Sequence, residues 1–182
     1  MGRTTIKTIR INGSEAEWER VENQLDIIKV IYDSKNKAYN TLTLALDYQV
    51  LIPDGKFTGY GYDAKGDTLL RYWYIALSPI YDNQWKNYSH LNLDDYSIQA
   101  AEYYLKLTVP EGITAQTNLQ KNKVEDGVHY FSGQHIREVS LYFSNDNPFQ
   151  TFKTTEDRVI LTDVFKKNKK KEVNLAKVKL ID

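Results

Sequence analysis

The stretch "TLTLALDYQVLIPDG", residues 41–55, carries the pattern that decides the fold. Its apolar positions recur at every second residue: Leu42, Leu44, Leu46, Tyr48, Val50 and Ile52. Thr43, Asp47 and Gln49 alternate with them, as expected for a strand with one buried and one wetter face. Pro53-Asp54-Gly55 then predicts a turn, because proline cannot donate to a sheet and glycine tolerates positive φ.

The same period of two recurs along most of the chain. It predicts strands over residues 4–11, 25–31, 72–77, 103–109, 113–118, 128–133, 136–143, 158–165 and 172–181, with a short piece around Trp18. Only residues 93–101 favour a helix, of about one turn. We therefore expect an all-β fold of about ten or more strands, built as a large twisted antiparallel or mixed sheet, saddle-like, or as a sandwich.

Composition narrows the functional classes. The chain has 182 residues, enough for one domain, and its 24 basic residues balance 24 acidic ones. A balanced charge argues against a nucleic-acid partner, and no apolar run is long enough for a membrane segment. The absence of cysteine excludes disulfides, thiolate zinc sites and a cysteine nucleophile. The first residues lack a hydrophobic signal region, so an exported or periplasmic parent would carry its signal upstream.

The sequence contains no group of residues that we expect to be catalytic. His129 and His135 lie on what the pattern predicts to be neighbouring strands, where they could share a metal, but such histidines more often bond to nearby groups. The acidic pairs at 94–95 and 125–126 suit turns better than a catalytic dyad. The glycines of residues 59–66 precede no predicted helix, so they fail as a phosphate loop. No catalytic and no metal residue is expected.

A lysine-rich run, residues 166–171, lies between two predicted strands. It reads as a solvated hairpin tip, with contact to an anionic surface as the alternative.

Aromatic residues gather between residues 60 and 88. Trp73, Tyr74, Tyr81 and Trp85 are the candidate ligand-facing members. They would form a stacking surface for a sugar ring or a peptide, or else fill a wide core between sheets.

Four segments in order resemble the N-terminal β-domain of the aminopeptidase N-like zinc metallopeptidases: "TLTLALDYQVLIPD", "YWYIALSPIYDNQW", "DDYSIQAAEYYLKLTVPEGITAQTN" and "VHYFSGQHIREVSLYFS". Within them, Trp73-Tyr74-Ile75 is similar to the family's W-Y-P segment, with isoleucine in place of proline. Tyr103 to Gly112 and residues 132–144 are similar to two later strand motifs. The resemblance spans about residues 9 to 150.

The resemblance implies a non-catalytic domain within a longer bacterial protein. Residues 1–182 would form a single β-domain that packs on a downstream catalytic domain and helps to form the cleft for a peptide substrate. Zinc, and the H-E-x-x-H motif that binds it, would belong to that next domain, so this chain is not expected to be an enzyme or to hold a cofactor. The alternative is a free-standing binding module for a glycan or peptide.

Overall fold

The computed structural model of the chain describes residues 2–32, 41–56, 59–87, 98–145, 150–153 and 159–162. Within these residues the fold is all-β, as the sequence predicts, and it has no helix. The strands are β1 (Arg3–Ile11), β2 (Ser14–Glu15), β3 (Trp18–Val21), β4 (Gln24–Val30), β5 (Leu44–Leu51), β6 (Gly61–Tyr62), β7 (Thr68–Leu70), β8 (Ile80–Tyr81), β9 (Gln84–Trp85), β10 (Ala101–Thr108), β11 (Thr114–Thr117), β12 (Gln120–Glu125), β13 (Val128–Ile136), β14 (Leu141–Ser144), β15 (Gln150–Lys153) and β16 (Val159–Thr162).

The sequence predicted a large sheet of about ten or more strands or a sandwich, but the described strands form several small separate sheets. Three sheets have the orders β2-β1-β5, β10-β13-β12 and β11-β14-β7-β6, and the pairs β3-β4, β8-β9 and β15-β16 stand as hairpins. The reason is the shortness of many strands. β2, β6, β8 and β9 have two residues each, so the chain turns away before a wide ladder can form.

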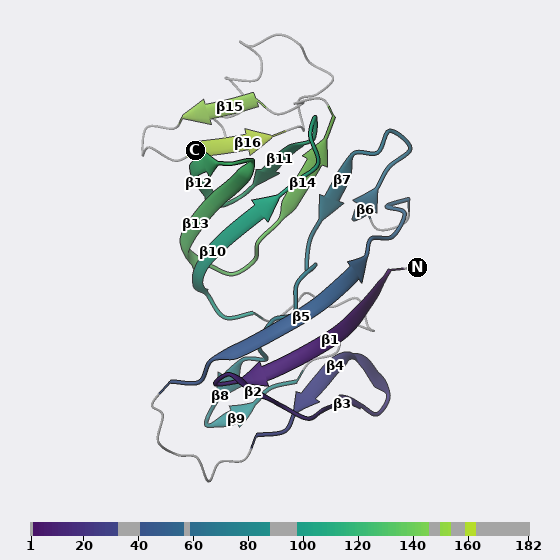
Figure 1. Cartoon of the computed structure of the whole chain (residues 1–182), viewed down its shortest axis with the longest axis vertical. Helices are drawn as coiled ribbons and strands as arrows, with labels where there is room; N and C mark the ends of the chain where they lie inside the picture. Colours follow the sequence, from purple (N-terminus) through teal and green to yellow (C-terminus); the bar gives the residue numbers. More distant parts are fainter. Residues whose placement is uncertain are drawn as a thin grey trace.

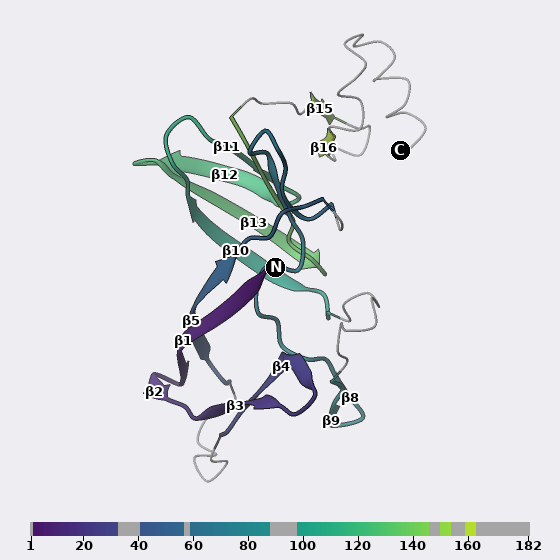
Figure 2. The same ribbon diagram turned by 90° about the vertical axis from the view of Figure 1, so that its right-hand side faces the viewer.

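Two groups of strands lie at opposite ends of the long axis (Figure 1). β1 to β5, β8 and β9 lie at one end, and β6, β7 and β10 to β14 lie at the other. Figure 2 shows the same separation after a quarter turn. The chain passes from one end to the other three times, after β5, after β7 and after β9. The segment between β7 and β8 is one of these three connections.

The first group is organised by the long antiparallel pair β1 and β5. Their register runs from Arg3 opposite Leu51 to Ile11 opposite Leu44, with a bulge between Ile6 and Thr8. Along β5 half-buried and exposed residues alternate strictly, which confirms the face predicted from residues 41–55. Ile9 of β1 is among the most buried residues that the structure describes, at 1% exposure.

The second group has its core beside β10 and β13. Leu119, Phe131 and Val139 are buried, and Tyr103, Leu105 and Leu107 of β10 pack against them, as the alternation in β10 predicts. A turn follows β10. Ile113 N–H donates to the Pro110 carbonyl at 3.2 Å, and Gly112 has φ 84.

Two strand predictions are wrong. Residues 72–77 form no strand. Tyr72 takes a left-handed conformation (φ 50), and the side chains of Trp73 and Tyr74 both bond to the backbone of Val139 rather than pointing to opposite faces. β13 runs on to Ile136, and the strand predicted over 136–143 begins only at Leu141. Residues 98–100 are irregular and Ala101 opens β10, so the helical turn is absent there. Residues 93–97, 166–171 and 172–181 lie outside the described part.

Candidate functional site

The four candidate aromatic residues belong to one segment, residues 71–85, which we call the aromatic arm. It leaves β7, crosses between the two groups of strands and ends in the β8-β9 hairpin (Figure 1). Its first part is held against the core by hydrogen bonds, whereas its last part projects aromatic side chains to solvent. The two parts of the arm therefore differ in burial.

Trp73 and Tyr74 anchor the arm at Val139. The indole Nε1–H of Trp73 donates to the Val139 carbonyl at 2.8 Å, and the Val139 N–H donates to the Tyr74 hydroxyl at 3.3 Å. The hydroxyl of Tyr74 also lies 3.1 Å from that of Tyr103 on β10. Edge-to-face ring contacts, with centroids 5.4 and 5.9 Å apart, connect Trp73, Tyr74 and Tyr103 in a row. These two candidates therefore pack against the core.

Burial raises the pKa of Tyr74 well above its ordinary value, and the hydrogen bond with Tyr103 raises it further. Both effects favour the neutral phenol. Tyr74 therefore keeps its proton, and with it the ability to donate as well as accept.

Arg71 fixes the start of the arm. Its guanidinium makes a two-point contact with the Glu138 carboxylate, at 2.7 and 2.6 Å, and donates to the hydroxyls of Tyr60 and Tyr72. It also lies over both tyrosine rings, 5.4 and 4.8 Å from their centroids. The hydrogen bond with Glu138 is the main reason that the pKa of Arg71 is raised. Tyr72, one of the two tyrosines that Arg71 contacts, takes an uncommon left-handed conformation, with φ 50.

Tyr81 and Trp85 lie at the exposed end of the arm. They belong to the β8-β9 hairpin, where Ile80 pairs with Trp85 and Tyr81 with Gln84 around a turn at Asp82-Asn83. Their exposed fractions are 50% and 56%, and that of Ile80 is 46%. The four candidates therefore do not form one binding surface. Trp73 and Tyr74 pack against the core, whereas Tyr81 and Trp85 are exposed on the hairpin.

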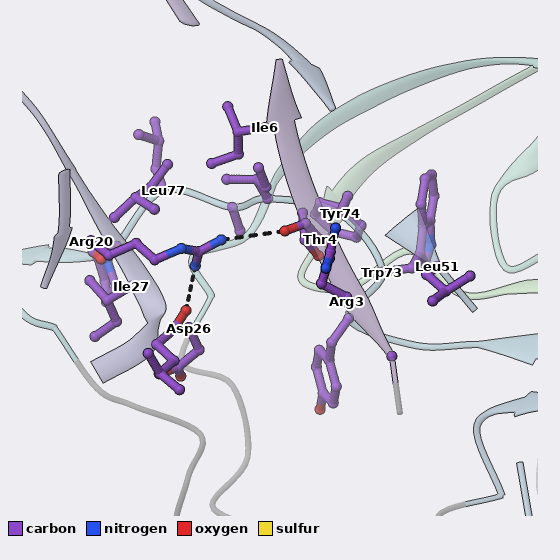
Figure 3. A pocket seen from close by; sticks show the side chains of 18 of the residues that line it. Arg3, Thr4, Ile6, Arg20, Asp26, Ile27, Leu51, Trp73, Tyr74 and Leu77 are labelled. Carbon is purple, nitrogen blue, oxygen red and sulfur yellow. Dashed lines mark hydrogen bonds between the residues drawn. The ribbon is translucent and has the colours of Figure 1, made fainter. Parts of the chain in front are cut away.

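A groove of about 950 Å³ lies beside the arm (Figure 3). Its walls come from the start of β1, from the β3-β4 hairpin and from residues 72–79 of the arm. Apolar side chains dominate the walls: Ile6, Leu25, Ile27, Ile28, Leu51, Ile75, Ala76, Leu77 and Pro79. Trp73 and Tyr74 also contribute to this lining, but Tyr81 and Trp85 do not.

Arg20 extends across this groove from the hairpin to β1 (Figure 3). Its guanidinium donates to the Leu25 carbonyl at 2.6 Å and to the Thr4 carbonyl at 3.3 Å. Arg3, Lys86 and Asp26 complete the charged lining, so three cationic side chains face one anionic side chain. The groove therefore combines apolar walls with a net positive charge.

The structure does not bring His129 and His135 together, because both lie on β13 and not on the two neighbouring strands that the sequence predicted. His129 and His135 lie six residues apart on the same strand, β13, so a rise of ~3.4 Å per residue places them roughly 20 Å apart. The ring of His129 instead stacks on Phe131, with centroids 6.2 Å apart. Within the described ranges no group of three or more potential ligands could hold a metal ion.

The acidic pair at 125–126 and Gly61 have structural roles, in a turn and in a close backbone contact. Glu125 pairs with Lys123 at 2.6 Å, and Asp126 and Gly127, both with positive φ, form the turn from β12 to β13. Gly61 lies so close to the Pro53 carbonyl that a Cβ there would meet it at 2.1 Å. The acidic pair at 94–95 lies outside the described residues.

Comparison of the chain with family models, with curated proteins and with solved structures found no match. In the part of the chain that the structure describes, no helix is long and apolar enough to cross a membrane.

Two features of the site were missed by sequence reasoning. Arg71 stands directly before the aromatic run, and a single basic residue between apolar segments was a usable signal. Arg20 offered none, because its position in the groove depends on how the β3-β4 hairpin folds back toward β1.

Proposed function

We propose that the chain is the non-catalytic N-terminal β-domain of an aminopeptidase-like zinc metallopeptidase. In this role it packs on a downstream catalytic domain of the same protein and helps to form the cleft for a peptide substrate. Zinc and the general base would belong to that domain, and this chain would contribute shape and exclusion of water. The resemblance of four ordered segments to that family suggests the proposal.

The exposed end of the aromatic arm is the structural observation that supports it. Ile80, Tyr81 and Trp85 are about half exposed on a hairpin whose strands have two residues each. An isolated hairpin of this size is barely stable in water, and clustered exposed apolar side chains mark an interaction surface. A second domain covering Tyr81 and Trp85 would account for both features.

The test compares the 182-residue chain with the protein that its gene encodes beyond Asp182. We expect hydrolysis of leucine p-nitroanilide and bound zinc only in the longer protein. There, replacing Tyr81 and Trp85 together by alanine should lower kcat/KM several-fold by loosening the domain contact. Tyr104→Ala is the matched control, because Tyr104 is also an exposed tyrosine, at 79%, but lies on β10.

Two results would contradict the proposal. One is hydrolysis by the 182-residue chain alone. The other is a gene product without zinc that binds a glycan or peptide through Trp85, which would favour the free-standing binding module.

A further inference from the structure

The first half of β1 has an open edge. β1 pairs with β5 along one edge over its whole length, from Arg3 to Ile11. On the other edge, β2 pairs only with Arg10 and Ile11, and the Ile9 carbonyl accepts from Ala16 N–H at 2.9 Å. Among the strands that the structure describes, none pairs with residues 3–8 on this second edge.

The backbone groups at this edge face the groove. The Thr4 carbonyl points to Arg20 and not to β5, since it accepts the guanidinium of Arg20. Alternate residues of a strand direct their N–H and C=O groups to the same edge, so those of Ile6 face the same way. Thr4 and Ile6 both line the groove. It thus has a row of directional backbone donors and acceptors on one wall and apolar side chains on the others.

We propose that the groove binds an extended peptide segment, which adds as a strand to the open edge of β1. Only a peptide backbone supplies alternating donors and acceptors at the spacing of this edge. The apolar walls would accept alternate side chains of the peptide. A volume of about 950 Å³ lies at the upper end of the range for binding pockets, enough for a short extended segment.

Charge indicates which peptides fit best. Arg3, Arg20 and Lys86 line the groove against Asp26, which favours a segment with an acidic side chain. Arg20 is the group that would bind this acidic side chain. Its 2.6 Å bond to the Leu25 carbonyl holds the side chain in place, while its bond to Thr4, at 3.3 Å, is long and easily exchanged for a carboxylate.

The position of the edge favours a single peptide strand over a second copy of this chain. The β3-β4 hairpin and residues 72–79 form walls beside the edge. A second copy would have to bring β5, which accompanies its own β1 throughout, into the space between these walls.

The probe is a fluorescein-labelled heptapeptide that alternates valine with threonine and carries a central glutamate. We expect saturable binding to the full chain with a micromolar Kd. N-methylation of alternate peptide amides, those that would face β1, should weaken binding at least about tenfold. Methylation of the other amides should have little effect. Equal effects of the two sets would overturn strand addition.

Arg20→Gln tests the acidic preference. The chain should bind the glutamate peptide about fivefold to tenfold more tightly than the same peptide with glutamine, and Arg20→Gln should remove the difference. Arg10→Gln is the control, because Arg10 is an exposed arginine of β1 that does not line the groove. A preference that survives Arg20→Gln would contradict the assignment.

Sedimentation velocity completes the test, and we expect a monomer. A stable dimer that excludes the peptide, or no binding of either peptide, would overturn the proposal. The outcome is independent of the proposed domain role, because Tyr81 and Trp85 lie outside the groove.

Discussion

Tyr74 connects the aromatic arm to β10 through its hydroxyl group, which contacts Tyr103 and the backbone N–H of Val139. Tyr74→Phe removes these bonds while keeping the ring. We expect the free energy of unfolding at pH 7 to fall by about 1 kcal/mol, the usual net value of such a bond. Urea unfolding followed by tryptophan fluorescence measures it.

The same substitution has a signed pH dependence. The pKa of Tyr74 in the folded protein lies above its ordinary 10.0, so the stability tied to its proton is complete below pH 10. Above pH 10 the unfolded chain releases this proton first, and the wild-type protein loses stability that Tyr74→Phe cannot lose. The difference between the free energies of unfolding of the two proteins should therefore become smaller from pH 10 to pH 11. A difference that stays constant would contradict the pKa direction. Tyr62→Phe is the control, because the side chain of Tyr62 is exposed.

Arg71→Lys tests the clamp at the start of the arm. Lysine keeps the charge but loses the two-point contact with Glu138 and the stacking on Tyr60 and Tyr72. We expect a loss of about 1–2 kcal/mol in the free energy of unfolding. Lys29→Gln breaks an exposed pair with Glu19 and should cost less than about 0.5 kcal/mol. Equal losses would show that the Arg71 cluster is no more than a surface pair.

Among the elements, β6 depends on a close backbone approach. Gly61, with φ 123, places its Cα hydrogen where a Cβ would lie 2.1 Å from the Pro53 carbonyl. Gly61→Ala should destabilise the protein by more than about 3 kcal/mol, because conformational strain and a backbone clash add.

Gly66→Ala separates these two costs. Gly66 has φ 84 and nothing within 4 Å of an added Cβ, so only the conformational strain of about 1–2 kcal/mol remains. Thermal unfolding of both variants measures the difference. Equal melting temperatures would contradict the close approach at Pro53.

The long strands were predictable because their signal is local. In β5 and β10 every second side chain is apolar, and burial on one face follows directly from this alternation, whereas in β1 the bulge after Ile6 shifts the buried face. The short strands β6 and β8 carry no such signal. β6 exists because Gly61 and Tyr62 pair with β7 and meet Pro53, contacts that only the folded chain brings together.

The candidate site was predictable as a cluster but not as an arrangement. The aromatic run marked the right segment, yet alternation placed Trp73 and Tyr74 on opposite faces. The left-handed Tyr72 and the shared contact with Val139 turn both rings toward the core. No local pattern encodes Val139, which is 65 residues from Tyr74 in sequence.

At the scale of the whole molecule, we expect the exposed end of the arm to serve association with a second domain and to add little to the stability of this chain. Replacing Tyr81 and Trp85 together by serine should change the free energy of unfolding by less than about 0.5 kcal/mol, because both are half exposed. The binding of the apolar dye ANS to the folded chain should fall. A large loss of stability would show that the hairpin packs against its own chain.

The most direct test of the domain role is to read the native gene beyond the codon for Asp182. The proposal predicts an H-E-x-x-H helix within the next few hundred residues, the zinc motif that this domain would cover. A stop codon at or near Asp182 would contradict it. The exposed aromatic hairpin would then be a binding surface of a free-standing module.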